Sequence, residues 1–395
     1  MERDQLKQGR LILLLMAHVV GTSGYFSILA MAPVIRSDLN INASHFGFLV
    51  LAFLGAQMLL ALPAGNFTDQ LGVNRSLGLS MFGLSVGTVG FILSDRLEYA
   101  LLSMFVMGLG YSLVNPATGK GVMDWFPKER RATAMGIKQL GVPLGGLISA
   151  GSGVFAVIID WRFILVLVSA ASLVTGLICF GLKEKAGRRR SNKRILEDIV
   201  TVIASRKLCV INAAVISFNI GQASLFTYLT LFIRDVAMAS QPVAALSLFF
   251  AQGASAAGRL GYSYLSDTWF RGGRKTIIVL VVMAAILSMI VACFVGPERN
   301  KFSLFLLAVF MGGTIAAHAA IIISATVESV EPRLAGSAIG YGAVSWSFGG
   351  MIGPPIFGYI LDTFESYTVS WLAIASIAML GLILFISMYH EVEPD

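Results

Sequence analysis

Two lysines, Lys120 and Lys138, lie in apolar stretches on either side of a short charged turn at residues 128–131. An ammonium group at membrane depth is costly, and it persists where it faces a wet cavity or the interior of a helix bundle. Two such cations on adjacent segments are suited to binding an anion. Lys138 has no acidic residue three or four positions away, so we expect its partner to come from another segment, from water or from a bound anion. The alternative is that Lys138 snorkels toward the inner headgroups.

Lys120 has a carboxylate within reach on its own segment. Asp124 follows four residues later and falls on the same face of a helix, so the two side chains are expected to pair near the cytoplasmic surface. We favour this interpretation of Lys120, and contact with a substrate anion is the alternative.

A third intramembrane cation, Arg259, shares one helix face with Gln252 and Ser255. Arg259 precedes the loop residue Asp267 by eight positions, which places it roughly 12 Å into the segment at 1.5 Å per residue. A role in a cavity and a structural pair with a loop carboxylate are equally open for it.

Further polar side chains fall within the apolar segments and could orient a substrate. A histidine among them could also carry a proton near neutral pH, although a lone histidine is more often a packing residue. These candidate binding residues are His18, Tyr25, Asn219, Gln222, Gln252, His318 and Tyr341.

The composition identifies a polytopic membrane protein. Of the 395 residues, 56% are hydrophobic and only 13% are charged, against about 25% charged in soluble domains. A helix needs roughly 20 apolar residues to cross the hydrocarbon core, and the charged breaks divide the chain into twelve such spans. The predicted spans are 11–35, 46–64, 77–93, 99–123, 132–159, 162–182, 208–233, 242–265, 276–295, 302–326, 336–361 and 369–389.

The polar segment 183–207 separates two sets of six spans. We therefore expect an N-terminal bundle at 1–182, a cytoplasmic linker at 183–207 and a C-terminal bundle at 208–395. Lysine and arginine number twenty in the loops on the side of the termini and six in the opposite loops. Because cytoplasmic loops carry the excess, both termini are predicted to be cytoplasmic. The net charge of +7 then reflects loops over an anionic leaflet, and nucleic acid is not an expected partner.

The sequence offers no sign of catalysis. It has no phosphate-binding loop for ATP, no spaced metal ligands and no set of nucleophile, base and acid in a soluble domain. The three cysteines lack the paired spacing of a disulfide or metal site. We expect no enzyme activity, no cofactor and no metal.

The two sets of spans repeat one another. A shift of 204 residues aligns Asp124 with Glu328 and Gly145-Gly146 with Gly349-Gly350, and a shift of 198 aligns Asp69 with Asp267. Because both copies begin in the cytoplasm, they are expected to be related by an axis along the membrane normal, with a substrate site between them near the midplane.

The loop after the second span, GNFTDQLGVNR at 65–75, resembles the signature loop of the major facilitator superfamily, and SDTWFRGGRK at 266–275 resembles its second copy. The first copy departs from the pattern at Gln70 and Asn74. The resemblance implies twelve helices in two pseudo-symmetric bundles of six and transport by alternating access. It also implies a cytoplasmic charge latch, in which Asp69 faces a helix N-terminus or an arginine. The expected latch residues are Asp69, Arg75, Asp124, Arg130, Arg131 and Asp267.

The run from Gly136 through Gly141 and Pro143 to Gly145-Gly146 is similar to a glycine-proline motif of the same superfamily. Small residues let helix backbones approach closely, so we favour plain packing over a hinge for this motif. Arg259 resembles the substrate arginine of monocarboxylate transporters and of the oxalate/formate exchanger.

The predicted spans contain no carboxylate at mid-depth, so the sign of a cavity would be positive. The favoured function is secondary transport of a small organic anion, carboxylate-like, across the inner membrane by a symporter or antiporter. A proton-coupled exporter of drugs or other small molecules is the alternative, and a receptor or scaffold without transport activity is a third class. The expected partners are the small anion, a coupling proton or counter-anion, and the lipid bilayer, and we expect a monomer.

Overall fold

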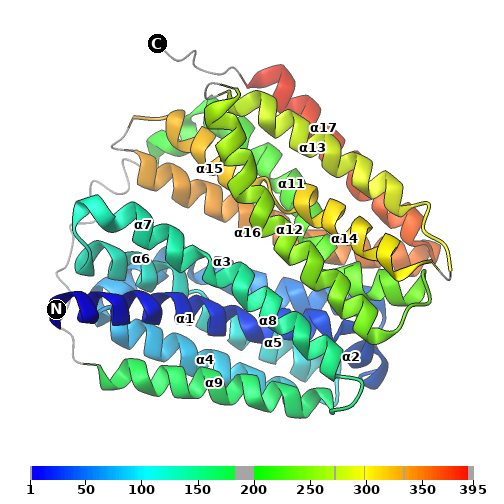
Figure 1. Cartoon of the computed structure of the whole chain (residues 1–395), viewed down its shortest axis with the longest axis horizontal. Helices are drawn as coiled ribbons and strands as arrows, with labels where there is room; N and C mark the ends of the chain where they lie inside the picture. Colours follow the sequence, from blue (N-terminus) through cyan, green and yellow to red (C-terminus); the bar gives the residue numbers. More distant parts are fainter. Residues whose placement is uncertain (1, 183–199, 271–272, 298, 332–333, 390–395) are drawn as a thin grey trace. The chain divides into compact units, whose positions relative to one another are not determined.

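A computed structural model describes residues 2–182, 200–270, 273–297, 299–331 and 334–389, and Figure 1 shows its course. Every regular element in this described part is a helix. The chain divides into two compact units. Unit 1 comprises Met1–Ile41 and Ala52–Arg190, and unit 2 comprises Asn42–Leu51 and Ser191–Asp395.

Unit 1 contains helices α1 to α9, except that the first part of α3, through Leu51, belongs to unit 2. Helix α4 packs against α5 and α9, and α1 packs against α8. The elements are α1 (Glu2–Ala30), α2 (Ala32–Asp38), α3 (Ala43–Leu71), α4 (Val73–Ile92), α5 (Leu97–Tyr111), α6 (Val114–Trp125), α7 (Lys128–Gln139), α8 (Gly141–Phe155) and α9 (Trp161–Gly181).

Unit 2 is organised around α11 (Arg206–Asp235), which packs against α12, α16 and α17. Most of the second half of α11 is buried, including Tyr228. The other helices are α12 (Gln241–Thr268), α13 (Arg274–Ala292), α14 (Lys301–Ile315), α15 (Ala319–Glu328), α16 (Ala335–Phe364) and α17 (Tyr367–Met388).

The helices confirm the expected all-helical polytopic fold. In the described residues, ten segments are long and apolar enough to cross a membrane. The two remaining predicted spans correspond to α7 with α8, and to α16. The first of these is split at Leu140 and carries the charged residues of α7, and the second is rich in glycine, serine and proline. Both compositions lower the hydropathy of a segment that is long enough to span.

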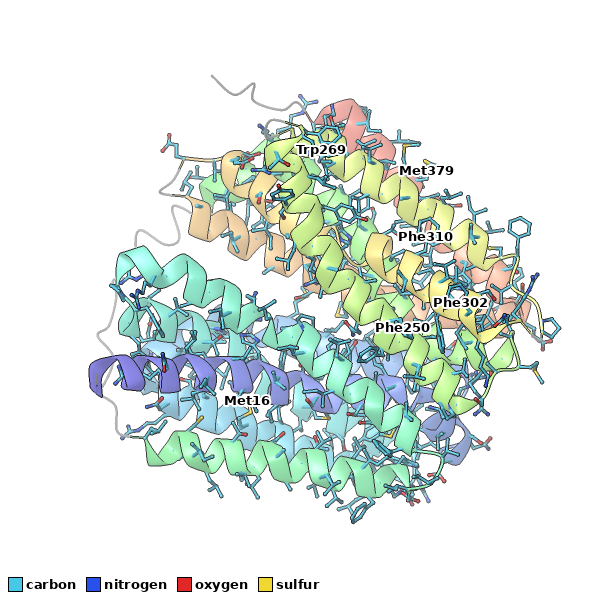
Figure 2. All side chains as sticks on the ribbon, viewed as in Figure 1. Met16, Phe250, Trp269, Phe302, Phe310 and Met379 are labelled. Atoms are coloured by element: carbon cyan, nitrogen blue, oxygen red, sulfur yellow. The ribbon has the colours of Figure 1, made fainter. Side chains whose placement is uncertain are left out.

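Apolar side chains cover the outside of both units. Phe302 of α14 is 72% exposed, and Met16 of α1 and Met379 of α17 are also exposed. Figure 2 labels these three side chains among those drawn on the helices. Exposed apolar area on this scale would form aggregation-prone patches in water, and a bilayer covers it.

Two predicted spans are broken at matching positions in the two units. Helices α5 and α6 are separated at Ser112, and α14 and α15 are separated at Ala316, which lies 204 residues later. Just before each break, a glycine lies against a backbone carbonyl of the neighbouring helix. These pairs are Gly108 with Phe53 and Gly312 with Ala251, and a Cβ on either glycine would overlap the carbonyl oxygen.

The paired breaks show that the repeat read from the sequence extends to backbone packing. A helix interrupted at the same register in both units leaves carbonyl groups without a helical donor, and side chains must supply one. The division of the chain at a linker of 183–207 stays a prediction, because residues 183–199 lie outside the described part. Residues 200–204 are helical.

Candidate functional site

In unit 1, Lys138 lies in the last turn of α7 and is only 3% exposed. Its Nζ is 3.0 Å from Thr118 Oγ1 of α6 and 3.5 Å from His18 Nε2 of α1. Thr118 Oγ1 is in turn 3.0 Å from His18 Nε2. The partner that the sequence led us to expect from another helix is therefore supplied twice, in each case by a neutral group. We call Lys138, His18 and Thr118 the lysine cluster.

The lysine cluster lacks a counter-ion among the described residues. The Thr118 hydroxyl lies 2.7 Å from the Val114 carbonyl oxygen, and because a carbonyl only accepts, it takes the hydroxyl hydrogen. Thr118 Oγ1 is then free to accept from Lys138. His18 Nδ1 is buried and has no hydrogen-bond partner in the described part. A buried ammonium with neutral partners is stabilised further by an anion.

Glycines hold α8 and the end of α7 against α1. A Cβ on Gly141 would lie 2.6 Å from the Leu15 carbonyl oxygen, and one on Gly145 would lie 2.7 Å from the Val19 carbonyl oxygen. Both distances are shorter than real Cβ contacts, so the close approach requires glycine. This geometry supports packing as the purpose of the glycine-proline motif and brings Lys138 next to His18.

In unit 2, Arg259 of α12 donates through Nε to the Ala316 carbonyl oxygen at 3.3 Å. Ser255, one turn earlier, donates its hydroxyl to the same oxygen at 2.8 Å. Ala316 lies at the break between α14 and α15, so two side chains of α12 supply the donors that the broken helix lacks. No carboxylate within the described stretches lies at ion-pair distance from Arg259, although the Asp267 side chain is outside them.

A second group of side chains surrounds His318, two residues beyond Ala316. His318 lies 5.3 Å from the Trp346 ring of α16 and 5.8 Å from the Phe218 ring of α11, measured between ring centroids. Asn219 donates through Nδ2 to the Trp346 carbonyl oxygen. We call His318, Trp346 and Asn219 the histidine cluster.

The remaining predicted ligands lie outside the two clusters. Gln222 and Gln252 are buried on α11 and α12 within unit 2. Tyr25 stacks on Phe53 at 4.4 Å between ring centroids, which is a packing contact. Tyr341 directs its hydroxyl toward Cys209 Sγ at 3.9 Å.

The expected latch contacts need one correction. Asp69 was expected to face a helix N-terminus or an arginine such as Arg130 or Arg131, but its carboxylate pairs with Lys120 at 3.0 Å. The expected pair of Lys120 with Asp124 is also present, at 3.5 Å. Lys120 is thus shared by two carboxylates at the ends of α3 and α6.

The arginines expected in the latch differ in their surroundings. Arg131 donates to the carbonyl oxygens of Met123 and Phe126, at 2.7 Å and 3.1 Å, and so caps the end of α6. Arg75 and Arg130 are exposed. Asp267 belongs to α12, and the position of its side chain lies outside the described part.

The sequence analysis missed the corresponding ion pair of unit 2. Arg274, at the start of α13, binds Glu328 at 2.9 Å and also donates to Ser266 at 3.0 Å. The signal was available, because the 204-residue shift aligns Glu328 with Asp124. Thr118 and Trp346 were also missed. Neither residue type is unusual in a membrane helix, and only the packing brings them to a histidine.

Comparison with known proteins places these features in a family. The family model described as Major Facilitator Superfamily matches residues 13–304 and 272–395. The chain is 24% identical to the hexuronate transporter of Bacillus subtilis (strain 168), over 95% of this chain and 94% of the relative. It is 25% identical to the galacturonate transporter of Dickeya chrysanthemi over 38% of this chain and 44% of that protein.

A third relative is the quinolone resistance protein NorA of Staphylococcus aureus (strain COL), which is 21% identical over 85% of each chain. Among solved structures, a point mutant of the nucleoside transporter NupG superimposes with a TM-score of 0.82 at 13% identity, over 96% of this chain and all of that one (100%). At this identity the structural likeness concerns the fold. The relatives and the solved structure named above are transporters and not enzymes. The matched family model spans nearly the whole chain, and the chain therefore belongs to the major facilitator superfamily.

Proposed function

We propose that this protein is a secondary transporter of small organic anions, with carboxylates of the hexuronate type as the first substrate class. Lys138 and Arg259 are each proposed to contact a negative charge. Transport proceeds by alternating access, and both chain termini and the 183–207 linker lie on the cytoplasmic side of the cell membrane.

The burial of Lys138 is the observation that carries the proposal. Its ammonium group belongs to a side chain that is 3% exposed, and its hydrogen-bond partners are a threonine and a histidine. Desolvating a charge without a counter-ion is costly, so a site of this kind gains from an anion and repels a cation. The hexuronate and galacturonate transporters among the relatives act on compounds that carry such a carboxylate.

A drug exporter is the second candidate, and the likeness to NorA favours it. A cationic drug would need a buried acid, and neither Lys138 nor Arg259 has a carboxylate within ion-pair distance in the part of the chain that is described. The positive charge of Lys138 and Arg259 therefore favours the anion transporter.

Ligand-induced stabilisation tests the proposal on the purified protein, because a ligand that binds only the folded state raises the melting temperature. The probes are galacturonate, galactose as its neutral counterpart, and a quinolone. We expect galacturonate to raise the melting temperature and galactose to have little effect. Equal shifts from galacturonate and galactose, or a shift from the quinolone alone, would refute the anion transporter.

A further inference from the structure

We propose that the histidine cluster of unit 2, formed by His318, Asn219 and Trp346, is a subsite for hydroxyl groups of the substrate. The transported anion is then a hydroxylated ring compound and not a plain alkyl carboxylate. This inference rests on the proposed function and adds to it the part of the substrate that carries no charge.

The orientation of the Asn219 amide is settled by its contact. Nδ2 meets the Trp346 carbonyl oxygen, and because a carbonyl oxygen only accepts, the amide nitrogen must be the atom facing it. Oδ1 is therefore the other end of the side chain. It is buried and has no hydrogen-bond partner within the described part of the chain. Asn219 presents an unused acceptor.

The tautomer of His318 follows from the same reasoning. Nδ1 lies 2.9 Å from the Ile315 carbonyl oxygen, so Nδ1 carries a hydrogen. A second proton on Nε2 would place a charge on a ring that is 2% exposed, two residues from the carbonyl group that Arg259 binds. In the neutral ring Nε2 is an acceptor. It too lacks a partner in the described structure.

Two buried acceptors beside the same tryptophan require hydrogen-bond donors. A carboxylate has only acceptor oxygens and leaves both unmet, and an ammonium is disfavoured by the nearby Arg259. A hydroxyl group donates without a charge, so it is the group that fits. The rings of Trp346 and His318 also offer the flat apolar surface that suits the C–H face of a sugar-like ring.

Two flanking amides add one more unpaired acceptor and one unpaired donor within the described part of the chain. Gln222 lies one turn beyond Asn219 on α11, and Gln252 lies one turn before Ser255 on α12. Gln222 Oε1 and Gln252 Nε2 are buried without partners among the residues described. Arg259 uses Nε to hold Ala316, and among the described residues its terminal guanidinium nitrogens have no carboxylate partner, so they suit a carboxylate of the substrate.

The test compares two anions of similar size that differ in hydroxyl groups, galacturonate and cyclohexanecarboxylate, by titration of the purified protein. The parent should bind galacturonate at least about tenfold more tightly, since each hydroxyl that meets a buried acceptor contributes up to roughly tenfold. His318→Phe keeps the stacked ring and Asn219→Leu keeps the volume, and each should remove about tenfold of galacturonate affinity while cyclohexanecarboxylate affinity stays within about threefold.

Asn212→Leu is the matched control. Asn212 is a buried asparagine on the same helix, two turns before Asn219, and it donates through Nδ2 to the Leu208 carbonyl oxygen of its own helix at 2.9 Å. Its Oδ1 also has no hydrogen-bond partner in the described part of the chain, but it lies roughly 10 Å along the helix from Asn219, so the control separates an unpaired amide in general from one in the histidine cluster. The control should keep the parent's ratio of the two affinities. Loss of the preference in the control to the same degree would mean a general packing effect and would overturn the subsite.

If a variant does not fold, the inference can still be tested by changing the ligand and keeping the parent protein. Removal of single hydroxyl groups from galacturonate should weaken binding to the parent protein. Equal binding of galacturonate, its deoxy derivatives and cyclohexanecarboxylate would overturn the hydroxyl subsite while leaving the anion transporter intact. Failure of every carboxylate to bind would refute the proposed function, and the subsite with it.

Discussion

The residues of greatest interest are cations that lack a counter-ion in the described part of the chain, and their sequence context predicted only some of their contacts. Lys138 stood out because its helix offers no carboxylate within four residues. Its partner Thr118 could not be recognised, because its hydroxyl also bonds to Val114 four residues earlier, as threonines in membrane helices do. The partnership exists only where α1, α6 and α7 meet.

Asp69 provides a prediction at the residue scale. Its carboxylate pairs with Lys120, and both members of the pair are partly exposed, whereas Lys138 is buried. Asp69→Asn should slow turnover through the latch while the affinity for galacturonate changes less than about threefold, because exposed ion pairs contribute only about 0–1 kcal/mol. Initial transport rates in proteoliposomes and equilibrium titration measure the two quantities separately. A large loss of affinity with unchanged turnover would exclude the latch.

At the scale of elements, glycines decide which helices approach each other. The sequence motif predicted close packing around Gly141 and Gly145, and the structure places both against α1. The break at Ser112 and its counterpart at Ala316 were not predicted, since hydropathy reads each broken pair as one continuous span. A break in the helix backbone does not change the pattern of apolar residues, so these two breaks could be found only from the structure.

Gly141 and Gly136 form a matched pair for a stability prediction. A Cβ at Gly141 would meet both His18 Cβ and the Leu15 carbonyl oxygen, whereas a Cβ at Gly136 would meet nothing within 4 Å. Gly141→Ala should therefore destabilise the protein by about 1–3 kcal/mol through overpacking. Gly136→Ala should be neutral or stabilising, because alanine is the better helix former.

Thermal unfolding in detergent measures this difference. The melting temperature should fall for Gly141→Ala and hold for Gly136→Ala. If the two variants melted together, the glycine at 141 would not serve helix packing, and the hinge interpretation of the motif would regain support.

For the whole molecule, composition and charge breaks were sufficient to predict an all-helical polytopic protein, and the resemblance of the loops at 65–75 and 266–275 to a signature loop indicated the major facilitator superfamily. The repeat of 204 residues was equally informative, because it extends from the aligned acidic residues to the helix breaks and glycine contacts of each unit. The two cations, Lys138 and Arg259, are not repeated in the other unit. Lys138 corresponds to Gly342, so the clusters of the two units differ in chemistry. The internal repeat therefore could not predict which substrate groups the two clusters bind.

Membrane topology is tested by labelling a cysteine placed in the linker. Ser191→Cys should react with a membrane-impermeant maleimide only after the cells are permeabilised, because we propose that the loops rich in lysine and arginine face the cytoplasm. The parent protein, which carries three free cysteines, supplies the background control. Labelling of Ser191→Cys in intact cells at the full rate would invert the proposed orientation.

The central claim is that Lys138 binds the negative charge of the substrate, and titration of galacturonate into the parent, Lys138→Ala and Lys120→Ala measures it at constant salt. Losing one partner of a buried charge pair costs about 3–5 kcal/mol, and about 1.4 kcal/mol is tenfold in affinity. Lys138→Ala should therefore weaken binding at least about a hundredfold. Lys120→Ala should change affinity far less, because Asp69 and Asp124 are its partners. Binding to Lys138→Ala within a few-fold of the parent would contradict the account.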